Sequence, residues 1–112
     1  MALVAVARTS EVVPGSMKKV VVDGREILLA NVGGTFYAIS ERCTHLGGHL
    51  SRGIIQDGIV TCPRHGSRFD VRTGQAVNGA TILFLHMGVK DIRTYPVRVV
   101  GDGVLVDLGS DG

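Results

Sequence analysis

Residues 43–65 read CTHLGGHLSRGIIQDGIVTCPRH and contain both cysteines of the chain. A histidine follows each cysteine, two positions later in CTH (residues 43–45) and three positions later in CPRH (residues 62–65). A cysteine thiolate is a soft, charged metal ligand, and a neutral imidazole is a borderline, uncharged one. Two of each make a complete set of four protein ligands, so this stretch predicts a metal centre.

Several centres can use two cysteines and two histidines. A structural zinc site commonly combines a cysteine pair with a separate histidine pair, whereas both pairs here are mixed. A [2Fe-2S] cluster with two cysteines on one iron and two histidines on the other suits mixed pairs, because each loop can send one ligand to each iron. The spacing therefore favours the cluster. A zinc-stabilised binding module without redox function and a single disulfide between Cys43 and Cys62 are the alternatives.

The interval between the two pairs, residues 46–61, has a physical explanation. Asp57-Gly58 lies between two short apolar runs, and Asp-Gly in that setting is a strong hairpin signal because both residues tolerate positive φ. One strand out, a turn and one strand back bring both pairs to the same end of the molecule. Asp23-Gly24 predicts another hairpin of the same kind.

The two motifs resemble the cluster loops of Rieske proteins, and specifically those of soluble Rieske-type ferredoxins. The resemblance is carried by CTHLGG (residues 43–48) and CPRHGSRFD (residues 62–70). Residues 33–39 and 95–99 also resemble flanking strands of that family, so the likeness extends over about residues 10 to 107. It implies one Rieske-type [2Fe-2S] cluster per chain.

The resemblance also implies the residues of the site. The expected cluster ligands are Cys43, His45, Cys62 and His65. Residues expected to cover the cluster or to donate hydrogen bonds to it are Leu46, Gly48, Arg64, Gly66 and Ser67. His49 and His86 are not expected to be ligands.

The chain departs from high-potential Rieske proteins in ways that bear on its reduction potential. Those proteins carry an additional cysteine in each loop, and the two form a disulfide; Gly48 and Arg64 occupy the matching positions here. Ser67 keeps one of two hydroxyls that bond the cluster, and Phe69 lacks the other. Because such hydroxyls favour the reduced state, we expect a potential in the lower part of the range of roughly −150 to +300 mV.

Length and composition predict one all-β domain. The 112 residues include 16 glycines and few aromatic side chains, and the valines and isoleucines favour short strands joined by tight turns. We expect an antiparallel β-sandwich or barrel of the Rieske type over residues 1–112, with a small cluster-binding subdomain at about residues 41–75. The expected strands are residues 3–7, 20–22, 27–30, 36–39, 54–55, 59–60, 69–71, 95–100 and 104–107.

Residues 82–91 resemble an insertion of about ten residues relative to the family. The preceding residues 77–81 stand where a proline-containing loop usually covers the cluster. The apolar insertion is compatible with an added strand, a short helix or an exposed docking patch, and packing into the core is the preferred interpretation.

The resemblance implies a one-electron carrier and not a stand-alone enzyme. Its expected partners are a flavin-dependent reductase and a terminal oxygenase, with no small-molecule substrate of its own. The same type of domain also serves as the small subunit of larger reductases such as nitrite reductase, which is a second functional hypothesis. Arg64, Arg68 and Arg72 are candidates for steering an acidic partner.

Charge and hydropathy exclude other classes of partner. The formal net charge is only +2, which gives no reason to expect nucleic acid. The chain has neither a basic, apolar leader nor an apolar run of about 18 residues. We therefore expect a cytoplasmic protein that does not bind membranes.

Overall fold

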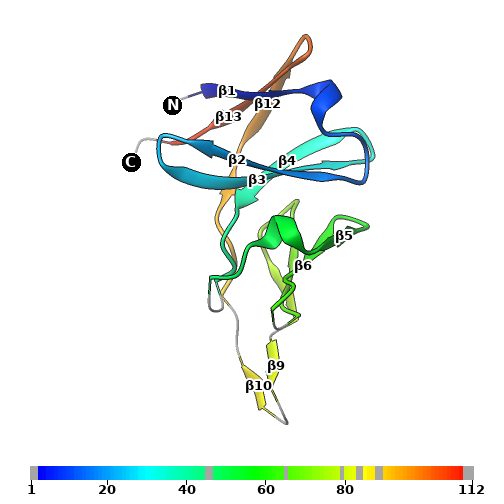
Figure 1. Cartoon of the computed structure of the whole chain (residues 1–112), viewed down its shortest axis with the longest axis vertical. Helices are drawn as coiled ribbons and strands as arrows, with labels where there is room; N and C mark the ends of the chain where they lie inside the picture. Colours follow the sequence, from blue (N-terminus) through cyan, green and yellow to red (C-terminus); the bar gives the residue numbers. More distant parts are fainter. Residues whose placement is uncertain are drawn as a thin grey trace.

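The computed structural model describes residues 3–44, 47–64, 66–78, 80–82, 85–87 and 90–109. All strand pairs among these residues are antiparallel, which confirms the all-β prediction. Figure 1 shows two sheets in the upper half of the molecule and a third sheet below them. The β9–β10 hairpin forms the lowest end of the view.

The upper half consists of an outer and a middle sheet. The outer sheet has the order β1 (Leu3–Arg8), β13 (Gly103–Asp107) and β12 (Val97–Val100). The middle sheet has the order β11 (Thr94–Tyr95), β4 (Thr35–Ser40), β3 (Arg25–Val32) and β2 (Met17–Val22). A short 3-10 helix, η1 (Thr9–Glu11), follows β1.

The lower sheet belongs to the part of the molecule that we call the metal half, which also includes residues 41–53 and 62–67. Its strands, in spatial order, are β5 (Ile54–Gln56), β6 (Ile59–Thr61), β7 (Arg68–Asp70) and β8 (Ala76–Asn78). A 3-10 helix, η2 (Leu50–Arg52), leads into β5. Among the described residues, neither helical segment has the length and apolar character needed to cross a bilayer.

Strand β3 lies between two hydrophobic cores. Ile27 and Leu29 pack with residues of the outer sheet, such as Val104, whereas Leu28 packs with residues of the metal half, such as Phe69. Both faces of β3 are therefore covered. A strand buried on both faces has a continuous apolar sequence, as residues 27–30 (ILLA) do, because successive side chains point to opposite faces.

The structure confirms the two Asp-Gly hairpins. Asp23 and Gly24 have φ values of 49° and 77°, and Asp57 and Gly58 have values of 53° and 79°. Two consecutive residues at positive φ give the turn whose twist matches that of the flanking strands. The first hairpin joins β2 to β3, and the second joins β5 to β6.

The prediction of one strand over residues 95–100 was wrong. Tyr95 in β11 pairs with Ala38 of the middle sheet, whereas Val97 in β12 pairs with Val106 of the outer sheet. Pro96 lies between them and has no N–H with which to continue a ladder. Its carbonyl still accepts a hydrogen bond from the Asp107 amide at 2.9 Å. The chain changes sheets at this proline.

The insertion contributes one strand of a separate pair whose other strand lies mainly before residue 82, so a strand is the alternative that its described backbone adopts. Strand β9 (Ala80–Ile82) pairs with β10 (Leu85–Met87) and with no other described strand. The predicted packing of the insertion into the core concerns side chains that lie outside the described part of the chain, and so does the prediction for the side chain of His86.

Candidate metal centre

Both cysteines are buried in the core of the metal half. Cys43 is 3% exposed and Cys62 is 2% exposed, and both thiols are free, so the disulfide alternative is wrong. They belong to the core that contains Leu50, Val60 and Phe69. The two predicted histidine ligands, together with Leu46, lie outside the described residues.

Matched backbone hydrogen bonds close the two metal loops, residues 43–48 and 62–67. The Cys43 amide donates to the Gly48 carbonyl at 2.8 Å, and the Cys62 amide donates to the Ser67 carbonyl at 2.7 Å. The Gly47 and Gly66 amides donate back to the carbonyls of the two cysteines at 3.0 and 3.1 Å. Each cysteine therefore begins a loop of the same construction, although one loop has CTH and the other CPRH.

The glycine four residues after each cysteine is the local reason for this shared geometry. Gly47 has a φ of 68° and Gly66 a φ of 76°, in the left-handed region that side chains with a Cβ rarely adopt. The repeated spacing of cysteine and glycine is visible in the sequence and was a missed signal of related loops. The amides of Gly47 and Gly66 donate to the cysteine carbonyls. A hydrogen bond from Gly66 to the cluster remains a prediction.

Gly48 brings the first loop against the second. A Cβ at this position would lie 2.9 Å from the Cys62 sulfur and 3.0 Å from Cδ of Arg64, closer than such atoms normally approach. Only a glycine allows the two loops to meet in this way. The two loops therefore meet here through close approach of Gly48 to the side chains of Cys62 and Arg64.

Ser67 carries a buried hydroxyl without a visible partner. The residue is 0% exposed, and its Oγ is the one buried side-chain oxygen or nitrogen in the described chain that makes no hydrogen bond there. A buried hydroxyl without a partner is costly. Phe69, two residues later and also fully buried, has no hydroxyl.

These residues fit a [2Fe-2S] cluster. Two free, buried thiols at the start of matched loops are suitable anionic ligands, and the unpartnered Ser67 hydroxyl is available as a hydrogen-bond donor. Gly48 leaves the space next to the Cys62 sulfur clear of side chain. No cluster of three or more metal-binding side chains is complete among the described residues, which exclude both predicted histidine ligands.

A buried carboxylate, which the sequence analysis missed, organises the base of the first loop. Glu41 is fully buried and accepts hydrogen bonds from the Ser51 amide at 3.1 Å and from the Ser51 hydroxyl at 2.6 Å. His49 Nδ1 lies 3.1 Å from the same carboxylate. The Leu50 amide also donates to the Glu41 carbonyl at 2.9 Å. The chain entering the loop is thereby fixed to the chain leaving it, and His49 is part of this network.

Arginine and lysine side chains surround a second carboxylate nearby. Lys19 Nζ lies 3.0 Å and Arg42 Nε 3.2 Å from Glu26. The hydrogen bond from Lys19 and, after it, the one from Arg42 lower the pKa of Glu26, which therefore remains charged. Arg42 also donates to the Gly47 carbonyl at 3.1 Å, so this network reaches the first metal loop.

A side-chain hydrogen bond links the first metal loop to the end of the insertion. The Thr44 hydroxyl donates to the Lys90 carbonyl at 2.7 Å. Further along, the Ile92 amide donates to the Gly74 carbonyl at 2.8 Å, and the Ser40 amide to the Arg93 carbonyl at 2.9 Å. Residues 90–93 thus connect the metal half to β4.

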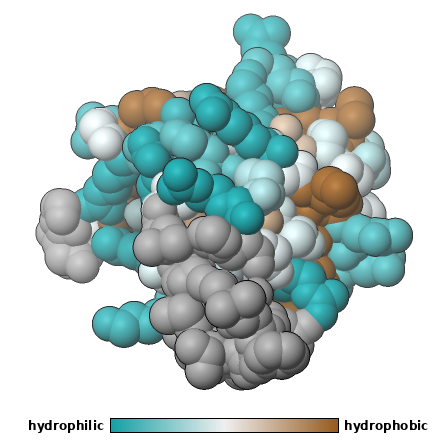
Figure 2. Space-filling model, turned by 60° about the horizontal axis from the view of Figure 1, so that its bottom comes forward, coloured by the Kyte–Doolittle hydropathy of each residue, from teal (hydrophilic) through white to brown (hydrophobic). Residues whose placement is uncertain are grey.

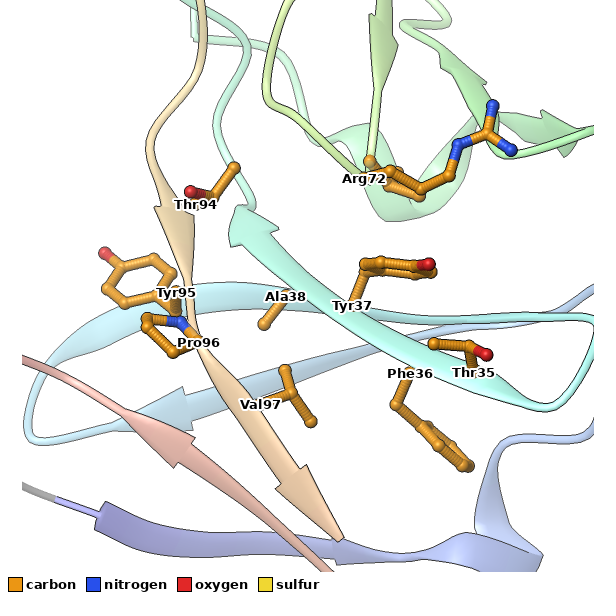
Figure 3. A pocket seen from close by; sticks show the side chains of 10 residues that line it. Thr35, Phe36, Tyr37, Ala38, Arg72, Thr94, Tyr95, Pro96 and Val97 are labelled. Atoms are coloured by element: carbon orange, nitrogen blue, oxygen red, sulfur yellow. The ribbon is translucent and has the colours of Figure 1, made fainter.

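A hollow of about 330 Å³ lies at the boundary between the middle sheet and the metal half. Figure 3 shows Tyr37 and Arg72 on opposite sides of it. Arg72 bonds Asp70 at 3.0 Å and the Asp57 carbonyl at 3.1 Å, and its bond to Asp70 raises the pKa of the guanidinium. Arg72 therefore braces the β5–β6 turn, and this engagement makes it a poor candidate for the predicted steering of a partner.

Fold and site together define a class of protein: a small antiparallel β protein with a metal centre between two cysteine-histidine loops of matched construction. The sequence profile of the Rieske [2Fe-2S] domain matches residues 2–84. The chain belongs to the Rieske [2Fe-2S] domain family.

Known relatives agree with this assignment. The chain is 36% identical over 108 residues to the ferredoxin component of biphenyl 2,3-dioxygenase from Rhodococcus jostii (strain RHA1), covering 96% of this chain and 94% of the relative. It resembles the solved ferredoxin of carbazole 1,9a-dioxygenase from Nocardioides aromaticivorans IC177, with a TM-score of 0.80, 35% identity and coverage of 96% and 98%. A solved complex of reduced oxygenase and oxidised ferredoxin in carbazole 1,9a-dioxygenase matches with a TM-score of 0.80 and 28% identity, over 94% of this chain and 92% of that chain.

The predictions of fold class, cofactor and general function are confirmed. The chain is a β protein of the Rieske type that carries a [2Fe-2S] cluster, and it is an electron-transfer component rather than a catalyst. The zinc-stabilised module was the wrong alternative. The names of the relatives favour a separate ferredoxin over the small subunit of a larger reductase.

Proposed function

We propose that this ferredoxin accepts single electrons from a flavin-dependent reductase and delivers them to a terminal oxygenase. The names of the relatives support this role, since they are ferredoxin components of dioxygenase systems. The complex of a similar ferredoxin with its oxygenase supports the receiving partner. The structural observation that carries the proposal is the pair of matched loops, each of which begins with a buried cysteine.

For the ligands, we propose that Cys43 and Cys62 bind one iron and that His45 and His65 bind the other. The burial of both thiols and the identical closure of their loops support equivalent roles for the cysteines. The family arrangement supports the histidines. When bound, the cluster supplies a centre that accepts and returns one electron.

The surrounding residues have distinct tasks in this proposal. Leu50 and Phe69 pack in the core that holds the cysteines and exclude water from the sulfur side. The Ser67 hydroxyl donates a hydrogen bond to the bound group, and Gly48 keeps the two loops in contact. Leu46 and Arg64 cover the site, as their positions in the family motif suggest.

We further propose that residues 1–112 act as one domain in the cytoplasm. The sharing of β3 between two cores supports a single folding unit. Two buried, unbridged cysteines suit a reducing compartment.

Electron paramagnetic resonance tests the carrier role and the ligands. We expect a Rieske-type signal that appears only after dithionite reduction, with two irons per chain. Substitution of His45 or His65 by alanine should abolish this signal, whereas the His49→Ala variant should retain it. A protein that binds one zinc and gives no signal would overturn the proposed function, and loss of the signal in His49→Ala alone would overturn the ligand assignment.

The partners are tested with the reductase and oxygenase of a biphenyl dioxygenase system from which the native ferredoxin is omitted. We expect NADH-dependent bleaching of the visible absorbance of this chain by the reductase, and recovery of that absorbance when oxygenase is added under anaerobic conditions. If dithionite reduces the chain but the reductase does not, the assigned donor is wrong. If the oxygenase fails to reoxidise the chain, the assigned acceptor is wrong.

A further inference from the structure

A hollow of about 290 Å³ lies directly beside the contact between the two metal loops. Gly48 forms part of its wall, and a Cβ at this glycine would lie 2.9 Å from the Cys62 sulfur. Three exposed arginines also line it, namely Arg42, Arg52 and Arg64. The hollow is therefore both basic and close to the cysteine of the second loop.

The hollow has a fixed wall. His49, whose side chain is 20% exposed, lines it and is oriented by the fully buried Glu41 carboxylate. Arg42 is held by Glu26 on one side and by the Gly47 carbonyl on the other. A binding site whose side chains are already oriented loses less conformational entropy when a ligand binds.

The balance of charge at the hollow is positive. The carboxylates bonded to lining residues are Glu26 and Glu41, and the cations are Lys19 and the three arginines, four positive charges against two negative ones. The carboxylates are the less exposed groups, since the side chain of Glu26 is 28% exposed and that of Glu41 is 0% exposed, whereas that of Arg42 is 52% exposed. A partner approaching from solvent therefore meets the arginines.

Figure 2 turns the bottom of the molecule forward and shows hydrophilic residues gathered above and to the left of the grey atoms, with a hydrophobic group to the right of centre. A polar surface next to a redox centre suits a transient complex, because charge pairs accelerate encounter without making dissociation slow.

We propose that this hollow receives an acidic side chain of the redox partner and so directs electron transfer through the metal end of the molecule. The proposal rests on the proposed function as an electron carrier. Carboxylates match the geometry and charge of arginine guanidinium groups, which can bind them with two hydrogen bonds. Among the three arginines, Arg52 bonds through its backbone amide, to the His49 carbonyl at 3.2 Å, and its side chain makes no hydrogen bond or ion pair within the described structure. Its replacement therefore changes the charge with the least effect on the loops.

Oxidation by small redox probes tests the sign of the charge at the electron exit. The dithionite-reduced protein is mixed in a stopped-flow instrument with ferricyanide, a trianion, or with tris(phenanthroline)cobalt(III), a trication, and each probe takes one electron. We expect added salt to slow the reaction with ferricyanide and to accelerate that with the cobalt complex, because the screening length falls from about 30 Å at 0.01 M to about 10 Å at 0.1 M salt. The Arg52→Glu variant should react with ferricyanide roughly tenfold more slowly at low salt.

Matched variants and a peptide define the site. Arg98→Glu, which reverses a charge on the exposed β12, should behave like the wild type. Arg52→Lys keeps the charge but not the two-bond geometry, so it should keep the salt dependence of the ferricyanide reaction and be less sensitive to hexaglutamate. Hexaglutamate should slow the ferricyanide reaction of the wild type but not that of Arg52→Glu, and inorganic phosphate at the same ionic strength should have little effect.

The outcomes separate this proposal from the function on which it rests. If the protein cannot be reduced by one electron, the proposed function fails and this inference fails with it. If both probes oxidise the protein but Arg52→Glu behaves like Arg98→Glu, only the docking hollow is wrong. Inhibition by phosphate without inhibition by hexaglutamate would also overturn it, since the hollow would then bind a small anion.

Discussion

Ser67 is the residue whose burial and chemistry point most directly at the redox centre. Its hydroxyl is fully buried and lacks a partner within the described chain. A donor to a cluster sulfur withdraws negative charge and stabilises the reduced state. The Ser67→Ala variant should therefore bind the cluster normally but have a lower potential, by about 60 mV for a tenfold change in the one-electron equilibrium. A redox titration followed by electron paramagnetic resonance measures this shift.

Two further variants make that experiment decisive. Ser10→Ala removes an exposed hydroxyl in η1 and should leave the potential unchanged. Phe69→Tyr adds a hydroxyl at a buried position and should raise the potential. If the potentials of Ser67→Ala and Phe69→Tyr both equal that of the wild type, hydroxyl donation does not tune this centre.

Gly48 sets the distance between the two loops. The added methyl group of Gly48→Ala would lie 2.9 Å from the Cys62 sulfur, so the loops must separate. We expect a destabilisation of about 1–3 kcal/mol, typical of overpacking, together with less than two irons per chain. Gly103→Ala is the matched control, since its nearest neighbour would be at an ordinary 3.4 Å. Iron analysis and chemical unfolding measure both effects, and full iron content in Gly48→Ala would contradict this account.

At the scale of elements, the first metal loop depends on a buried hydrogen-bond network at its base. Glu41 accepts from the amide and hydroxyl of Ser51 and faces His49. Glu41→Ala removes the acceptor of these part-buried donors, which costs about 1–3 kcal/mol for a donor left unsatisfied. The variant should lose iron to a chelator faster than the wild type and unfold at a lower temperature.

Glu11→Ala is the control for this network. Glu11 is an exposed carboxylate that pairs with Lys18 at 2.8 Å in the upper half. Its removal should change neither chelator resistance nor the unfolding temperature appreciably, because exposed ion pairs are screened by solvent. Equal iron loss from Glu11→Ala and Glu41→Ala would mean that the effect is not specific to the loop.

The elements that could be predicted are those specified by neighbouring residues. Asp23-Gly24 and Asp57-Gly58 predict their hairpins because two adjacent residues determine the turn. The pairing of Glu41 with Ser51 could not be predicted, since ten positions separate them and only the closed loop brings them together. The change of sheet at Pro96 could not be predicted either, because it depends on pairing with distant strands: β4 before the proline and β13 after it.

At the scale of the molecule, the continuous apolar run at residues 27–30 predicts a strand but not the two cores that it joins. Which core each side chain of β3 enters depends on strands that are distant in the sequence. These are β13 on one side of β3 and β6 and β7 on the other. For the centre, residue types and spacing were sufficient to identify the class, because four ligands of two kinds restrict the possible centres. The hollow beside the loops depends on tertiary structure and could not be predicted.

The shared strand predicts how the molecule unfolds. Leu28 packs with the two cysteines, whereas Leu29 packs with the outer sheet, and both are fully buried. Replacing either by alanine should cost about 2–5 kcal/mol. If β3 couples the two cores into one cooperative unit, thermal loss of the visible cluster absorbance and of the far-ultraviolet circular dichroism should coincide in the wild type and in Leu29→Ala. Only Leu28→Ala, next to the cysteines, should also change the potential. Separate transitions in the wild type would show that the two halves fold independently and that the chain is not a single domain.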